Sequence, residues 1–67
     1  MKNKIRDIRK KLKLSQEDLA IRCGVTRQTI NAIENDKYDP TLALAFKLSM
    51  HLNITVDQLF IFGEDQK

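Results

Sequence analysis

The sequence contains only one cysteine, one histidine, one proline, two glycines and no tryptophan in its 67 residues. A single cysteine cannot form an internal disulfide, so packing and hydrogen bonds must hold this small fold together. Cys23 and His51, each the only residue of its kind, provide no cluster of metal ligands, and we expect neither a metal site nor a cofactor. Few glycines and prolines together with 42% hydrophobic residues indicate an ordered chain without low-complexity segments.

Long hydrophobic runs and catalytic motifs are also missing. The longest all-apolar stretch, residues 42–46, is far too short to cross a bilayer, and no apolar segment follows the first four residues. We therefore expect a cytoplasmic protein without a membrane partner. The sequence has no histidine-centred pair and no glycine-rich phosphate loop, so it predicts no catalytic residues, no enzymatic activity and no small-molecule ligand.

The charge is distributed unevenly along a chain whose length allows one domain, residues 1–67, with a single core. The formal net charge is +3, with 12 Lys and Arg residues against 9 Asp and Glu residues. Residues 1–37 carry ten basic and five acidic groups, a net +5, whereas residues 38–67 carry two and four, a net −2. The basic first half therefore predicts a polyanionic partner for that half.

Two short helices are expected at the start of the chain. Helical spacing of apolar residues predicts the first, which ends near Lys13. Its apolar positions are Ile5, Ile8 and Leu12. The second is expected over about residues 15–23, where Ser15 offers an N-cap oxygen to Asp18 and Gly24 permits a left-handed exit.

A third helix is expected over about residues 26–35, with Thr26 as its N-cap. Two very short helices joined by a tight glycine-containing turn are typical of a helix-turn-helix, in which the first helix braces the second in the DNA major groove. The side chains on the outer face of this third helix suit base edges, because Arg pairs with guanine acceptors and the Gln or Asn amide pairs with adenine. These candidate base-reading residues are Arg27, Gln28 and Asn31.

The remaining chain predicts two more helices and a tail. Either Asp39 or Thr41 is expected to cap a fourth helix that runs to about Leu52. Thr55 and Gln58 have the spacing of a capping box for a fifth helix, and the segment after it has the pattern of a short extended tail. On the fourth helix, the inward face is expected to contain Leu42, Ala45, Leu48, Ser49 and Leu52.

Three segments carry a resemblance to a known family: residues 14–20 (LSQEDLA), residues 24–35 (GVTRQTINAIEN), and Tyr38 with Pro40-Thr41-Leu42. In this order they resemble the phage repressor/Cro (XRE) helix-turn-helix family, and in particular its short stand-alone bacterial regulators. The resemblance covers about residues 4–60. It implies an all-α, five-helix lambda-repressor-like fold, with a short terminal β-strand pair left open. It further implies a transcriptional regulator, expected to be a repressor, that binds double-stranded DNA at a palindromic operator as a homodimer.

The resemblance also implies roles for individual residues. Gln16 bonds a phosphate and helps to position the first turn of the recognition helix, and the alternative is a solvated helix terminus. Arg9 and Glu34 form a structural ion pair between the first and third helices. The full set of expected phosphate contacts is Gln16, Thr26, Thr29, Asn35, Lys37 and Tyr38.

Several apolar residues exceed what so small a core can take, and we expect them to form a twofold dimer interface. They lie on the fourth helix and on a dimer-forming helix and tail at about residues 55–63. The full set is Phe46, Met50, Leu59, Phe60, Ile61 and Phe62. Two alternatives stay open: Phe60 or Phe62 completes the monomer core, or the tail pairs as a strand with residues 1–4.

The main alternative function is that of an antitoxin-like protein-interaction module with the same fold. Such a protein neutralises a partner protein, and an extension or a large extra apolar patch would distinguish it. Cys23 is expected to be a small buried residue, with a redox sensor as the alternative.

Overall fold

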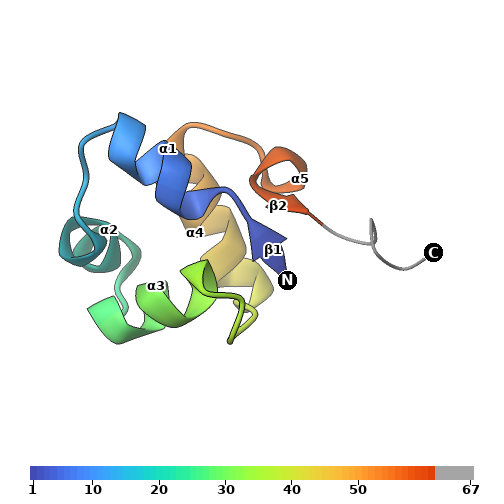
Figure 1. Cartoon of the computed structure of the whole chain (residues 1–67), viewed down its shortest axis with the longest axis horizontal. Coiled ribbons are helices and arrows are strands. Elements are labelled where there is room, and N and C mark those ends of the chain that lie inside the picture. The colour runs from blue at the N-terminus through green and yellow to red at the C-terminus, as the bar shows by residue number, and fades with distance from the viewer. Residues whose placement is uncertain (62–67) are drawn as a thin grey trace.

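The computed structural model describes residues 1–61, which form five helices and two short strands (Figure 1). The chain is mostly helical, and its first and last described segments meet as a two-stranded sheet. The elements in chain order are β1 (Lys2–Asn3), α1 (Ile5–Lys11), α2 (Gln16–Cys23), α3 (Arg27–Glu34), α4 (Leu42–Leu52), α5 (Val56–Leu59) and β2 (Phe60–Ile61). None of these helices has the length and apolarity that a membrane-spanning segment requires.

Both ends of α2 are capped as the sequence predicts, the N-terminus by side chains and the C-terminus by a left-handed glycine. The Ser15 hydroxyl accepts from the Asp18 backbone N–H at 2.9 Å, and the Asp18 carboxylate accepts from the Ser15 N–H at 3.1 Å. This reciprocal pair is a capping box, and its hydrogen bonds from Ser15 hold the pKa of Asp18 below its ordinary value. Gly24 ends the helix with a φ of 73°, a left-handed conformation that glycine adopts without a Cβ penalty.

Other helix ends depart from expectation in two places, and at a third the structure decides between two expected caps. The first helix ends at Lys11, two residues before the predicted end, because Lys13 takes a positive φ of 60°. Thr41 rather than Asp39 caps α4, through a 3.2 Å bond from the Leu44 N–H to the Thr41 hydroxyl. The capping box predicted at Thr55 is absent, since the Thr55 side chain accepts no capping hydrogen bond.

Two threonines at N-cap positions therefore allow a matched test of capping. We expect Thr41→Ala to lower the free energy of unfolding by about 1 kcal/mol, because it removes a side-chain acceptor from an orphan N–H. Thr55→Ala removes no capping hydrogen bond and serves as the control, with a change of a few tenths of a kcal/mol. Urea unfolding followed by circular dichroism measures both variants, and equal losses would contradict the assignment of Thr41 as the stabilising cap.

The core lies between α4 and the other helices, and α4 runs behind α1 through the middle of the molecule in Figure 1. Leu48 and Leu52 of α4 belong to one buried cluster with residues of the other four helices. Leu42, expected on the inward face, is instead exposed, and Leu44 takes a buried position.

Burial raises the pKa of the Cys23 thiol, so Cys23 lacks the reactive thiolate that a redox sensor needs. The buried apolar residues contributed by α1 to α3 are Ile5, Leu19, Ala20, Cys23, Ile30 and Ile33.

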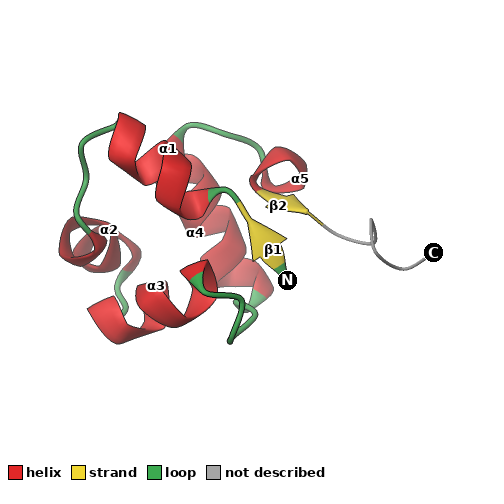
Figure 2. Ribbon diagram, viewed as in Figure 1, coloured by secondary structure: helices red, strands yellow, loops and turns green. Residues whose placement is uncertain are grey.

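The two ends of the described chain form an antiparallel pair, drawn as adjacent yellow arrows in Figure 2. Lys2 lies opposite Ile61 and Asn3 opposite Phe60, and the Lys4 N–H donates to the Leu59 carbonyl at 2.9 Å. The strand alternative therefore describes residues 60 and 61 correctly.

Leu59 and Phe60, expected in the dimer interface, are instead buried in the core of one chain. For Phe60 this is the alternative that the sequence left open. The strand pair draws Leu59 and Phe60 inward, where they keep 0% and 8% of their exposure. Both side chains complete the core of one chain and offer almost no surface to a second copy. Ile61 is half-buried, whereas Phe62, also assigned to the dimer contact, lies outside the described residues.

Candidate nucleic-acid interface

Helices α2 and α3 are joined by residues 24–26 only, and this tight turn sets their relative direction. The Val25 N–H donates to the Ala20 carbonyl at 3.0 Å, which closes the turn after the left-handed Gly24. Thr26 then caps α3 by accepting from the Thr29 N–H at 3.2 Å. The result is a pair of short helices in which α2 braces α3.

Helix α3 has one buried and one exposed face. Ile30 and Ile33 are fully or almost fully buried, and they hold the helix on the core. Arg27, Gln28 and Asn31 are all exposed on the other side. The structure therefore brings together a guanidinium and two amides on one rigid surface, and these groups can meet the donors and acceptors of base edges.

The residues expected to contact phosphates surround this face but differ in how they are held. Thr26 and Thr29 share a 3.1 Å hydrogen bond between their hydroxyls, so both take part in the start of α3. Lys37 and Tyr38 follow α3 with exposed side chains. The Lys37 backbone N–H donates to the Ala32 carbonyl at 2.9 Å, which fixes the path of this loop close to the end of the helix.

Gln16 contacts a different part of α3 from the part that the resemblance implies. Its Nε2 atom donates to Glu34 Oε1 at 3.0 Å, so it reaches the last turn of α3 rather than the first. One Nε2 hydrogen is used in this bond, and the second is available for an acceptor outside the protein. Gln16 is thereby positioned at the N-terminus of α2 by a fixed carboxylate.

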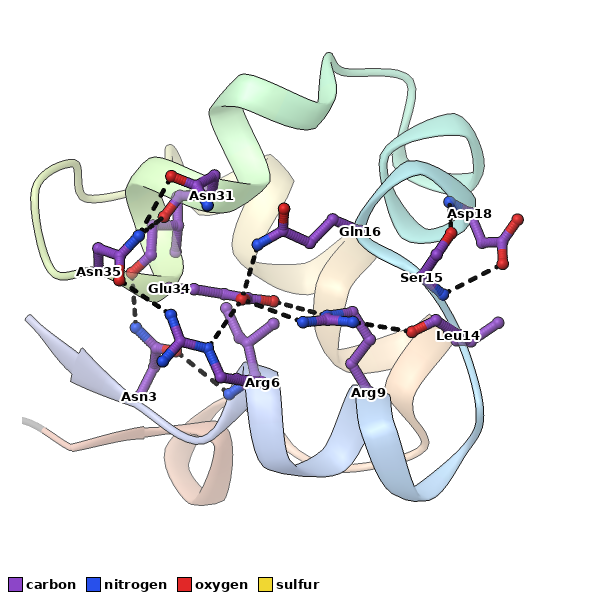
Figure 3. A network of polar contacts seen from close by, with 12 residues as sticks. Asn3, Arg6, Arg9, Leu14, Ser15, Gln16, Asp18, Asn31, Glu34 and Asn35 are labelled. Atoms are coloured by element: carbon purple, nitrogen blue, oxygen red, sulfur yellow. Dashed lines mark hydrogen bonds and ion pairs between the residues drawn. The ribbon is translucent and has the colours of Figure 1, made fainter.

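Glu34 is the centre of a buried polar cluster at the end of α3 (Figure 3). The expected ion pair with Arg9 is present, with Arg9 Nε 2.7 Å from Oε2 and Nη2 3.3 Å from Oε1. Arg6 Nε also donates to Oε1 at 3.3 Å. Burial opposes ionisation of Glu34, but hydrogen bonds from Arg9 and Gln16 and the charge of Arg9 hold its pKa below the ordinary value.

Three polar residues in this region have roles that sequence reasoning missed. Arg6 Nη2 donates to Asn35 Oδ1 at 2.9 Å, and Asn35 Nδ2 donates to the Asn31 carbonyl at 2.9 Å and to Asn31 Oδ1 at 3.1 Å. Asn3 Nδ2 donates to the Ile33 carbonyl at 2.8 Å and so ties β1 to the end of α3. The i, i+4 spacing of the two asparagines is a sequence signal for their contact. The contacts of Arg6 and Asn3 depend on the tertiary fold.

Comparison with known proteins agrees with this geometry. The pattern of the family described as "Helix-turn-helix" matches residues 5–59. An uncharacterized HTH-type transcriptional regulator of Methanocaldococcus jannaschii is 48% identical over 66 residues, which cover 98% of this chain and 100% of that protein. The HTH-type transcriptional regulator YgzD of Bacillus subtilis, also uncharacterized, is 40% identical over 65 residues, covering 97% and 98% of the two chains.

Solved structures show the same arrangement of helices. The restriction-modification controller protein C.AhdI of Aeromonas hydrophila superposes with a TM-score of 0.78 at 32% identity, covering 85% of this chain and 86% of that one. The N-terminal DNA binding domain of SinR from Bacillus subtilis gives a TM-score of 0.77 at 26% identity, covering 96% and 91%. The arrangement of helices described above is therefore shared with these two solved structures.

Proposed function

Because this chain belongs to the XRE-type helix-turn-helix family of DNA-binding transcriptional regulators, we propose that it represses transcription by occupying a palindromic operator as a homodimer. The observation that carries the proposal is the exposed face of α3, where Arg27, Gln28 and Asn31 stand on a helix anchored from behind by Ile30 and Ile33. Bound dimers would exclude RNA polymerase from a promoter that overlaps the operator. Such a regulator acts in the cytoplasm, where prokaryotic DNA lies.

Phosphate contacts around α3 set the register of the protein on the duplex in this proposal. Lys37 supplies an ammonium and Tyr38 a hydroxyl, both exposed in the loop after α3. Gln16 supplies its second amide hydrogen, while Thr26 and Thr29 supply hydroxyls at the N-terminus of α3. The basic surface of the first half of the chain makes binding steeply dependent on salt.

The proposed dimer contact is an apolar stripe on α4. Leu42, Phe46 and Met50 recur at i, i+4 and i+8, and their exposed fractions are 70%, 53% and 70%. The stripe is continuous with an open groove of about 580 Å³ whose lining includes Pro40, Leu42 and Val56. Exposed apolar surface of this kind supports a self-complementary interface, and a twofold axis would present two α3 helices to successive turns of DNA.

Sedimentation measures the proposed assembly directly. The protein at micromolar concentration should sediment as a dimer of 7.8 kDa chains and dissociate on dilution. A monomer at micromolar concentration with an intact helical circular dichroism spectrum would refute the homodimer.

The sequence preference is measured by selection of bound duplexes from random DNA at a fixed salt concentration. The wild-type protein should enrich an inverted repeat. Gln28→Ala should lower affinity for that repeat by about 1–3 kcal/mol and relax one base position in each half-site, because it removes an amide that reads a base edge.

The matched control for this variant is Gln58→Ala, an exposed glutamine on α5 away from the candidate interface. It should leave both affinity and base preference unchanged. Salt-sensitive binding by the wild-type protein without any enriched motif would count against sequence-specific regulation.

A further inference from the structure

A relay of three side chains leads from α1 to the exposed face of α3. Arg6 Nη2 donates to Asn35 Oδ1 at 2.9 Å, and Asn35 Nδ2 donates to Asn31 Oδ1 at 3.1 Å. Figure 3 shows the three side chains in this order, with Asn31 at the far end from α1. The relay thus connects a residue that faces the buried cluster with one of the candidate base-reading residues.

The chemistry of the first member fixes the polarity of the other two. A guanidinium has only donors, so Asn35 must turn its carbonyl oxygen toward Arg6 and its NH₂ group toward Asn31. Asn31 must then accept with Oδ1, which leaves its NH₂ group as the outward part of the amide. An unrestrained asparagine could present either its oxygen or its nitrogen to a base.

We propose that Arg6 and Asn35 are positioning residues that make Asn31 read DNA as a hydrogen-bond donor. Asn31 Nδ2 would then meet an acceptor in the major groove, which is purine N7, guanine O6 or thymine O4. This assignment rests on the proposed DNA-reading function of α3, and it adds which base-edge chemistry one residue selects. It also replaces the phosphate role expected for Asn35, because Asn35 Nδ2 already donates to two oxygens of Asn31.

The buried cluster around Glu34 fixes the orientation of the Arg6 guanidinium, the first member of the relay. Arg6 Nε donates to Glu34 Oε1 at 3.3 Å, so the guanidinium is held at one edge while its Nη2 atom meets Asn35. Glu34 is itself held by Arg9 and Gln16. The second bond of Asn35, to the Asn31 carbonyl at 2.9 Å, fixes the asparagine against the last turn of α3.

The substitution Asn35→Asp should reverse the hydrogen-bonding polarity that Asn31 presents to DNA. A carboxylate has no donor, and Arg6 remains its cationic partner, so the introduced carboxylate would accept from both of its neighbours. The carboxylate loses the bond to the Asn31 backbone carbonyl, which can only accept, and its remaining contact with Asn31 requires the Asn31 NH₂ group to turn toward it and Oδ1 to point outward. Selection from random duplexes should then show one changed position in each half-site, with a base that offers a donor in the major groove, adenine N6 or cytosine N4.

The control for the added negative charge is Lys37→Gln, which lowers the net charge by the same one unit just beyond the relay. It should weaken binding to all duplexes about equally, reduce the slope of log affinity against log salt by about 1, and leave the base preference unchanged. A shift of base preference seen in Asn35→Asp but not in Lys37→Gln is the signature of the relay.

Arg6→Gln provides a second variant if Asn35→Asp unfolds. Glutamine can both donate and accept, so it removes one of the two contacts that orient the Asn35 amide and leaves only the bond to the Asn31 backbone carbonyl, while Arg9 and Gln16 still hold Glu34. Discrimination at the same base position should fall about tenfold, with a circular dichroism melting curve close to that of the wild type.

Two results overturn the inference, and they are distinguishable. An operator motif that is unchanged in Asn35→Asp and Arg6→Gln would remove the relay but leave sequence-specific binding intact. A wild-type protein that enriches no motif would remove the proposed function and the relay with it.

Discussion

Glu34→Ala is expected to lower the free energy of unfolding by about 3–5 kcal/mol, because it leaves one charge of a buried ion pair without its partner. The Glu34 side chain has 0% exposure and that of Arg9 has 10%. The carboxylate accepts from Arg6, Arg9 and Gln16, so one substitution disconnects three helices. The free energy of unfolding of a small domain is itself only several kcal/mol, so we expect the variant to be partly unfolded at 37 °C.

The control for this loss is Glu17→Ala, an exposed glutamate on α2 that should change stability by no more than about 0.5 kcal/mol. A double variant, Arg9→Met with Glu34→Leu, should recover much of the loss, since apolar residues remove the unpaired charge. Urea unfolding measures all three. A loss below about 1 kcal/mol in Glu34→Ala would show that the pair is not desolvated as the structure indicates.

The same carboxylate makes stability depend on pH in the acid range. Its pKa is lower in the folded than in the unfolded protein, where it has an ordinary value near 4.5. The stabilisation is therefore complete above that unfolded-state pKa and is lost as the pH falls through the lower, folded-state pKa. Glu34→Gln cannot titrate at this position, so the stability difference between wild type and Glu34→Gln should shrink across this acid range.

The turn between α2 and α3 could be predicted from sequence because its determinants are local. Ser15 and Asp18 lie three residues apart, and Gly24 follows the helix that it terminates. The strand pair at the chain ends has no such local signal, since Lys2 and Ile61 lie at opposite ends of the described sequence. At Thr55 a local signal is present but misleading. Thr55 and Gln58 have the spacing of a capping box, yet the Thr55 side chain accepts no capping hydrogen bond in the folded chain.

The candidate interface likewise contains features that the local sequence predicts and contacts that depend on the tertiary fold. Helical periodicity alone placed Arg27, Gln28 and Asn31 on one exposed face. It could not show that Arg6 reaches Asn35 across a sequence separation of 29 residues. Contacts of this kind follow from how α1 packs beside the end of α3, and that packing depends on the whole core.

The exposed stripe of α4 leads to the other large expected effect. Phe46→Glu should convert the proposed dimer to a monomer, because it places a charge among apolar side chains at the twofold contact, next to Leu42 and Met50. Loss of the dimer removes the second α3 helix from the complex, and affinity for a two-half-site operator should fall by about 10²-fold or more. Phe46 is 53% exposed in one chain, so the melting temperature of the fold should change little.

The matched control is Ile21→Glu, which places the same charge at an apolar side chain with 68% exposure on α2, away from the stripe. Sedimentation should show a monomer for Phe46→Glu and a dimer for Ile21→Glu. DNA binding by Phe46→Glu should then depend on a single half-site, so that a duplex with one half-site binds about as well as one with two. A dimeric Phe46→Glu protein would contradict the α4 contact, whereas a monomer that retains the full advantage of two half-sites would contradict the link between dimerisation and operator binding.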